Sequence, residues 1–212
     1  MRTISLARLS VLAAVVALAQ GCAVGQKVNY GDAAMFSVNV SAKNIALGVQ
    51  DRRPYVLNRD KTPDFVGLSR GGFGNPFDVN TASGRPLADE VADLVARSLR
   101  QRGASVDVVN VPVLDSPENA RKRLLAGSAA RALHITIAEW KSDSFMGTGL
   151  SYDLLAIGYD AAGRKLGEHR VNGEDNLGGS SGIHSARDRL PGELAKKVEQ
   201  LLNDARLDGV LR

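Results

Sequence analysis

The hydrophobic positions of this chain follow two periods, one typical of strands and one typical of helices. Leu133, Ile135 and Ile137 fall on every second residue and therefore share one face of a predicted strand. A glycine within 160–163 suits a short turn, so the two segments that flank it are expected to form a hairpin. On these grounds strands are predicted at 44–49, 105–111, 132–140, 150–159 and 165–173.

Apolar residues spaced three and four apart predict two amphipathic helices before residue 130. The first follows Gly84, with Pro86 in its opening turn and Gly103 just past its end. The second opens at Ser116 and Pro117, where a capping hydroxyl precedes a residue that has no backbone N–H to satisfy.

A third helix closes the chain, and its start is open between Ser185 and Leu190, with Pro191 favouring the later one. The elements then follow the order β-α-β-α-β-β-β-α. This order predicts a single α/β domain, in which helices pack against a mixed parallel and antiparallel sheet. Right-handed crossovers are expected to place the first two helices on one face, and the last three strands form an antiparallel meander.

The N-terminus has the composition of an export signal. Arg2 and Arg8 precede or border an apolar run from Leu9 to Ala19, which is shorter than the ~20 residues that a membrane-spanning helix needs. Two cleavage sites are open. Residues 17–19 match Ala-x-Ala and would leave a soluble protein, whereas residues 19–22 resemble a lipobox without the leucine usual three places before its cysteine.

Cysteine usage favours the second site, because Cys22 is the only cysteine of the chain. A lone free thiol in an oxidising compartment forms mixed disulfides, whereas lipidation explains both its presence and its position. We therefore expect residues 1–21 to be a signal peptide, 22–43 a lipidated tether that ends in an edge strand, and 44–212 a periplasmic domain. Ala23 stands where an aspartate would favour the inner membrane, so the outer membrane is expected.

The charge of the mature chain is nearly balanced. Two of the 27 Lys and Arg residues lie in the predicted signal, which leaves 25 against 23 Asp and Glu. A net charge of +2 with no basic run argues against a nucleic-acid partner.

Residues 55–84 are expected to form a long connection rich in Gly, Asn, Asp and Pro. A connection of this length inside a domain is usually functional or disordered. Phe65 lies in a strand-like stretch and is predicted to fold back onto the sheet. Phe73 and Phe77 are predicted to stay exposed and to contact a partner protein.

Two motifs suggest chemistry and fail on their context. Residues 178–182 match G-x-S-x-G, but Glu174 to Asn176 make no buried strand before Ser180, and the histidine and acid that follow come in the wrong order for a hydrolase. His134, His169 and His184 have no metal-ligand spacing, and the first two lie on strands separated by a third. We therefore expect no metal and no cofactor.

Asp51, Arg52 and Arg53 end the first strand, where open sheets often bind ligands. Two adjacent arginines can grip a phosphate or a carboxylate. Alternatively, the aspartate pairs with one arginine for structural reasons while the other is solvated. Trp140, near the end of another strand, packs at the sheet margin or takes part in a contact surface.

Several segments also suggest a family: residues 51–53, a first helix ending in Gln101-Arg102-Gly103, the run 133–143, and a hairpin that opens with a tyrosine. In their order these segments resemble the YajG-type periplasmic lipoproteins over roughly 44–207, together with the lipidated start. The chain departs from that family in its 55–84 insertion. The resemblance implies an outer-membrane lipoprotein without known catalysis, and it supplies no active-site residues.

These observations lead to one expected function and two alternatives. The first is a non-enzymatic periplasmic module that is bound to the membrane through its lipid and binds an envelope protein. The second is a carrier or sensor of a small anionic or glycan ligand at the Asp51–Arg53 end of the sheet. A hydrolase comes third. A preformed concavity beside Arg52 and Arg53 favours a ligand, and an exposed aromatic patch on the insertion favours a protein partner.

Lipidation at Cys22 is directly testable. Mass analysis of the mature N-terminus should show an acylated Cys22, and Cys22→Ser should release the chain from membranes because the acyl chains supply the membrane affinity. A mature chain that begins at Gln20 would instead establish the Ala-x-Ala cleavage.

Overall fold

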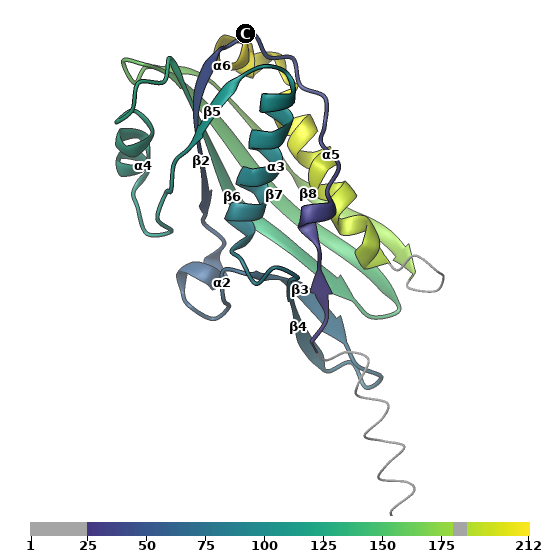
Figure 1. Ribbon diagram of the computed structural model, residues 1–212. Helices are drawn as coiled ribbons and strands as arrows, with labels where there is room; N and C mark the ends of the chain where they lie inside the picture. The colour runs from purple at the N-terminus through teal and green to yellow at the C-terminus, as the bar shows by residue number, and fades with distance from the viewer. Residues whose placement is uncertain (1–24, 180–185) are drawn as a thin grey trace, which may run out of the picture.

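The alternating segment around Leu133 forms β6 (Arg131–Ser144), and the rest of the sheet is arranged around this strand (Figure 1). The computed structural model describes residues 25–179 and 186–212. The elements in chain order are β1 (Lys27–Val28), η1 (Tyr30–Asp32), β2 (Asn44–Asp51), α2 (Pro54–Leu57), β3 (Phe65–Arg70), β4 (Pro76–Thr81), α3 (Leu87–Gln101), β5 (Ser105–Val108), α4 (Pro117–Leu124), β6, β7 (Gly147–Asp160), β8 (Lys165–Gly179), η2 (Ala186–Arg189), α5 (Leu190–Leu202), η3 (Ala205–Leu207) and α6 (Asp208–Leu211).

The two edges of β6 have different neighbours. Antiparallel β7 pairs along nearly all of one edge, and β8 pairs with β7 beyond it. On the other edge, parallel β2 pairs with the first part of β6 as far as Ile137, and parallel β3 pairs with the last part from Ser142 onward. The predicted α/β domain with a mixed sheet and a terminal meander is confirmed.

The helices cover both faces of the sheet, so the prediction that the first two share one face is wrong. Helices α3 and α5 pack with Leu47 and Leu133 in the main core, whereas Leu124 of α4 packs with Ala46 and Ala132 on the opposite face. The reason is topological. β5 lies on one side of β2 and β6 on the other, so the two crossovers run in opposite directions across the sheet. Right-handed crossovers in opposite directions place their helices on opposite faces.

The segment predicted as a tether belongs to the fold from residue 25 onward. Tyr30, Phe36 and Val38 are buried in the main core, and the Trp140 indole N–H donates to the Tyr30 hydroxyl at 2.7 Å. The edge strand is β1, not the alternating stretch near Phe36. In that stretch Phe36 and Val38 are buried in the main core, Ser37 and Asn39 are exposed, and none of these residues is in a strand.

The 55–84 insertion is also ordered, contrary to the prediction of a long connection. Its residues form α2 and the β3–β4 hairpin, and β3 extends the sheet beside β6. Phe65 is buried, as predicted. The glycines that suggested a loop serve the hairpin turn, where Gly74 adopts a φ of 81°.

The predicted ends of most helices and turns are confirmed. The Ser116 hydroxyl accepts the Asn119 N–H at 3.2 Å and caps α4. Gly163 closes the β7–β8 turn with a φ of 79°. Helix α5 begins at Leu190, the later of the two starts considered, and η2 precedes it. No described helix has the length and apolar character needed to cross a membrane. Cys22, Ser180 and His184 lie outside the described residues.

His134 is buried on the face of β6 that α4 covers. It is 3% exposed, and its Nε2 has no hydrogen-bond partner among the described residues. Burial disfavours the charged imidazolium and lowers the pKa of His134 from 6.5 to about 4. The native state therefore prefers a neutral His134.

This preference predicts a pH dependence of stability. The unfolded chain takes up a proton at His134 near pH 6.5, whereas the folded chain resists protonation down to about pH 4, so stability falls as the pH drops through this window. Between pH 7 and pH 4.5 the unfolding free energy should lose about 2–3 kcal/mol through His134 alone. Urea unfolding of wild type and His134→Gln across this range measures the difference. Parallel curves for the two proteins would contradict the assignment.

A candidate binding groove at the end of β2

Arg53 is fully buried and forms an ion pair with Asp51 at the end of β2. Its Nε and Nη2 donate to the two carboxylate oxygens at 2.9 and 2.6 Å. The remaining donors reach backbone carbonyls: Nη1 those of Phe65 (2.5 Å) and Trp140 (3.3 Å), and Nη2 that of Pro63 (3.0 Å). All five guanidinium N–H groups therefore have protein acceptors.

This geometry excludes Arg53 from ligand binding and corrects the hypothesis of an arginine pair that grips an anion. Burial by itself lowers the pKa of Arg53, but the hydrogen bonds and the charge of Asp51 outweigh it and raise that pKa. Of the two alternatives, the structural ion pair is the one observed. Arg52 is half-buried and donates from Nη1 to the Val113 carbonyl at 3.1 Å.

The buried pair shapes the chain that follows it. Because Arg53 binds the carbonyls of Pro63 and Phe65, it fixes the point at which the α2 loop returns to the sheet. Tyr55 packs edge-on against Phe65, with ring centroids 5.4 Å apart. Arg59 has a φ of 64°, uncommon for a residue with a side chain, and its N–H donates to the Val56 carbonyl at 3.1 Å. These contacts hold the α2 loop, residues 52–64, as one wall beside the end of β2.

A second wall is formed by the connection between β5 and α4. The Gln50 side-chain amide donates to the carbonyls of Pro112 (2.8 Å) and Asp115 (2.9 Å), and Arg52 holds Val113 between them. Polar side chains at the end of β2 therefore hold both walls in place.

Between these walls lies a mainly apolar, solvent-open groove of about 410 Å³. Leu114 stands at its rim with 71% of its surface exposed. Arg59, Asp60 and Lys61 add charge at the rim, and the Lys61 ammonium is bound by Asp78 at 2.5 Å. We refer to this concavity as the β2 groove; it is lined by Val56, Leu57, Arg59, Asp60, Lys61, Thr62, Pro63, Val113 and Leu114.

The aromatic candidates take different places. Phe73 is exposed in the β3–β4 turn, as predicted, and it does not line the β2 groove. Phe77, also predicted to be exposed, is half-buried and lies beside Gly71. Trp140 is 0% exposed, which excludes a contact surface and contradicts that alternative. Its indole packs edge-on against the Tyr30 ring, with ring centroids 6.4 Å apart.

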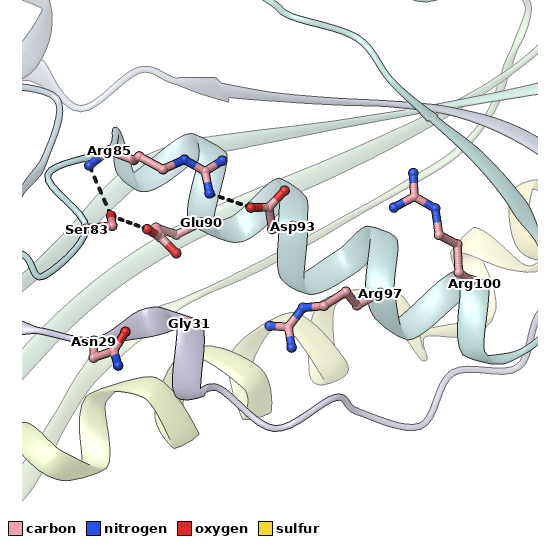
Figure 2. A pocket seen from close by; sticks show the side chains of 8 residues that line it. All are labelled: Asn29, Gly31, Ser83, Arg85, Glu90, Asp93, Arg97 and Arg100. Atoms are coloured by element: carbon pink, nitrogen blue, oxygen red, sulfur yellow. Dashed lines mark hydrogen bonds and ion pairs between the residues drawn. The ribbon is translucent and has the colours of Figure 1, made fainter.

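Figure 2 shows a second hollow, of about 430 Å³, along the outer side of α3. Arg85 is neutralised by Asp93 at 2.6 Å, and Glu90 accepts from the Ser83 hydroxyl at 2.5 Å. The guanidinium of Arg97 points toward the N-terminal segment, whereas that of Arg100 points away from it (Figure 2). Basic groups that diverge do not form an anion site, so this hollow is a solvated helix face.

The described residues contain no group of three or more His, Cys, Asp and Glu that could hold a metal ion. His134 pairs across the sheet with Ile157, and His169 pairs with the adjacent Ala156, so the two imidazoles face opposite sides of the sheet. His169 Nδ1 lies 3.1 Å from the Leu201 carbonyl of α5.

Comparisons with known proteins support the fold. No protein-family model and no curated protein sequence matches the chain. Among solved structures, protein XCC0632 from Xanthomonas campestris, of family DUF330, has a TM-score of 0.51 at 13% identity, over 88% of this chain and 96% of its own. The likeness establishes the fold alone.

Two further structures match less well. PelC from Paraburkholderia phytofirmans, solved as a dodecamer, has a TM-score of 0.42 at 16% identity, over 80% of this chain and 95% of its own. Lipoprotein GNA1162 from Neisseria meningitidis has a TM-score of 0.31 at 14% identity, over 76% of this chain and 99% of its own.

Sequence reasoning found the end of β2 but missed the groove beside it. The apolar lining comes from Val56 and Leu57 on one connection and Val113 and Leu114 on another, more than fifty residues apart in the chain. The available signal was the apolar pair Val113-Leu114 within a connection, where polar residues are usual.

The role of the buried pair predicts unequal effects for two neighbouring arginines. Arg53→Met leaves Asp51 charged, buried and unpaired, and should lower the unfolding free energy by about 3–5 kcal/mol. Arg52→Met removes one hydrogen bond at a half-buried position and should cost about 1 kcal/mol. Urea denaturation of both variants tests this, and equal losses would refute the structural role of Arg53.

Proposed function

We propose that this protein is a non-enzymatic envelope lipoprotein, anchored to the outer membrane through Cys22, that binds a protein partner in the β2 groove. The observation that carries the proposal is the groove itself: an apolar concavity whose two walls are held by Gln50, Arg52 and Arg53. A surface of this kind is ready to bind without rearrangement, which lowers the entropic cost of association.

The chemistry of the groove favours an apolar protein segment over a small anion. Small-ligand sites combine an apolar lining with a few converging polar groups. Here the polar groups at the end of β2 are bound to the protein's own carbonyls, and Arg53 is buried beneath them. The exposed Leu114 at the rim offers the kind of apolar contact that a partner side chain desolvates.

Charge at the rim contributes little to the choice of partner. Arg59 is exposed, and the ion pair of Lys61 with Asp78 is itself partly solvated. Asp60 adds the opposite charge at the same rim, so the rim charges nearly cancel and the apolar lining decides which segment binds. The groove lining contains the hydroxyl of Thr62 but neither histidine nor cysteine. The residues present are therefore suited to binding, and we assign no reaction to them.

An amphiphile with an apolar chain and an anionic head is the second candidate occupant. Its support is the combination of the apolar lining with the exposed Arg59 at the rim, although Asp60 stands beside that arginine. Native mass spectrometry of the protein extracted from its own envelope separates the two candidates, because a bound amphiphile adds a discrete mass to the chain.

The test for a protein partner uses a photo-cross-linking residue at Leu114 in living cells. The matched position is Val108, which is also exposed, at 43%, but lies on β5 outside the groove lining. A discrete protein adduct is expected from position 114 and not from position 108. Leu57→Asp should reduce this adduct about tenfold or more, since loss of a buried anchor costs about 2 kcal/mol of binding.

Two outcomes decide against the groove as a protein site. One is an equally strong adduct at both positions. The other is an adduct at position 114 that survives Leu57→Asp although the melting temperature shows that the variant folds.

A further inference from the structure

Three large apolar side chains stand in water at the tips of two hairpins. Phe73, in the turn between β3 and β4, is 86% exposed. Phe145 and Met146, in the turn between β6 and β7, are 47% and 83% exposed. We call these three residues the tip cluster. Single exposed apolar residues are common, but a group of this size at one place marks an interaction surface.

The register of the sheet brings the two turns together. β3 runs parallel to β6 with Ser69 beside Ser144. The two strands therefore end on the same side of the sheet, about 4.8 Å apart. Just before the turns, Arg70 donates from Nε (2.8 Å) and Nη2 (2.5 Å) to the two carboxylate oxygens of Asp143. This bidentate pair ties one hairpin to the other.

The chain enters the fold alongside the β3–β4 hairpin. β1 runs parallel to β4 with Lys27 beside Asn80, so the backward direction from Lys27 leads toward Pro76, at the foot of the β3–β4 turn. In Figure 1 the start of β1 lies at the lower end of the molecule, next to this hairpin. Cys22 precedes Lys27 by five residues, a length of chain that spans at most ~18 Å.

We propose that the tip cluster inserts into the interfacial region of the bilayer, as a second and purely apolar membrane contact beside the lipid on Cys22. The inference rests on the proposed lipid anchor. Cys22 lies within ~18 Å of Lys27, so its lipid keeps the β3–β4 hairpin near the bilayer, and the tips meet lipid more readily than any diffusing protein. Phenylalanine and methionine side chains leave water favourably for the acyl boundary.

The charges around the tips predict the lipid dependence. Arg70 and Asp143 neutralise each other, so little net charge faces the bilayer at the foot of the turns. Insertion should therefore proceed on zwitterionic lipid and gain little from anionic lipid.

Insertion would also orient the domain. A lipid anchor alone lets the protein pivot, whereas a lipid and two hairpin tips define a plane. β6 then rises from the bilayer. The end of β2, where the groove begins, pairs with Ile137, which is seven residues or about 23 Å along the strand from Ser144. The groove would then lie at a fixed height above the membrane, and a partner would bind at that height.

The experiment places a polarity-sensitive fluorophore at Met146→Cys in the full mature chain. The control label is at Ala161→Cys, in the exposed turn at the opposite end of the 14-residue β7, about 45 Å away. A lipidated Cys22 has no free thiol, so each variant accepts one label. The labelled chains are reconstituted into phosphatidylcholine vesicles with and without brominated acyl chains.

Bromine should quench the label at position 146 strongly and leave the label at position 161 unaffected. Adding Phe73→Ser and Phe145→Ser should reduce the quenching at position 146 by about threefold or more, because the apolar side chains of both tips contribute to insertion. The matched variant Val108→Ser removes an exposed apolar side chain on β5, away from the tips and the groove, and should leave the quenching unchanged.

The outcomes separate this inference from the lipid anchor. Equal, weak quenching at both positions on a vesicle-bound chain overturns the insertion and leaves the anchor intact. Two labels per chain show that Cys22 is unlipidated. The Cys22→Ser chain with the label at 146 is then mixed with the same vesicles, and quenching supports insertion whereas its absence overturns it. A blue shift at 146 that grows with protein concentration in the absence of vesicles assigns the tips to a second copy, and also overturns the proposal.

Discussion

The buried ion pair of Asp51 and Arg53 is the constraint on which the architecture around it depends. A guanidinium that is 0% exposed is tolerated only if its charge is paired and all its N–H groups are bonded. Arg53 meets this condition with acceptors from three parts of the chain: the end of β2, the approach to β3 and the middle of β6. Satisfying one charge therefore fixes three segments relative to one another.

The pair stands where the sheet changes partners. β6 pairs with β2 as far as Ile137 and with β3 only from Ser142, so its edge between them lacks a strand to bond. Side chains supply the missing donors there: Arg53 and the Tyr55 hydroxyl both donate to the Trp140 carbonyl. The Tyr55 hydroxyl also donates to Glu139 at 2.6 Å, and burial and its carboxylate neighbour keep the pKa of Tyr55 above its usual value. The Trp140 carbonyl in this gap is therefore hydrogen-bonded by side chains instead of by a neighbouring strand.

The groove at the end of β2 depends on the same group of polar side chains. The polar end of β2 holds its two walls, the α2 loop and the β5–α4 connection, and the interior of the groove remains apolar. Specificity at this site therefore depends on shape and apolar contact, while the ionic groups act as its supports. The groove lies at the end of β2, whose last residue Asp51 pairs with Ile137 of β6, and the tip cluster lies at the end of β6.

The sequence by itself determined the local elements. The periodicity around Leu133, the Ser116 cap and the glycine at position 163 each act within a few residues, so the helix, strand and turn that they predict could be located directly. It also determined that Phe65 would be buried, because its stretch has the composition of a strand.

The tertiary structure decided what depends on distant pairing. The strand β3 and the buried segment after residue 25 resemble connections in isolation, and only their contacts with β6, α3 and α5 give them a place in the core. The role of Arg53 also depends on distant residues. Two adjacent arginines suit an anion site, but the carbonyls of Pro63, Phe65 and Trp140 accept the hydrogen bonds of Arg53 and leave none for a ligand. Burial of a charge is decided by the acceptors that the whole fold brings to it.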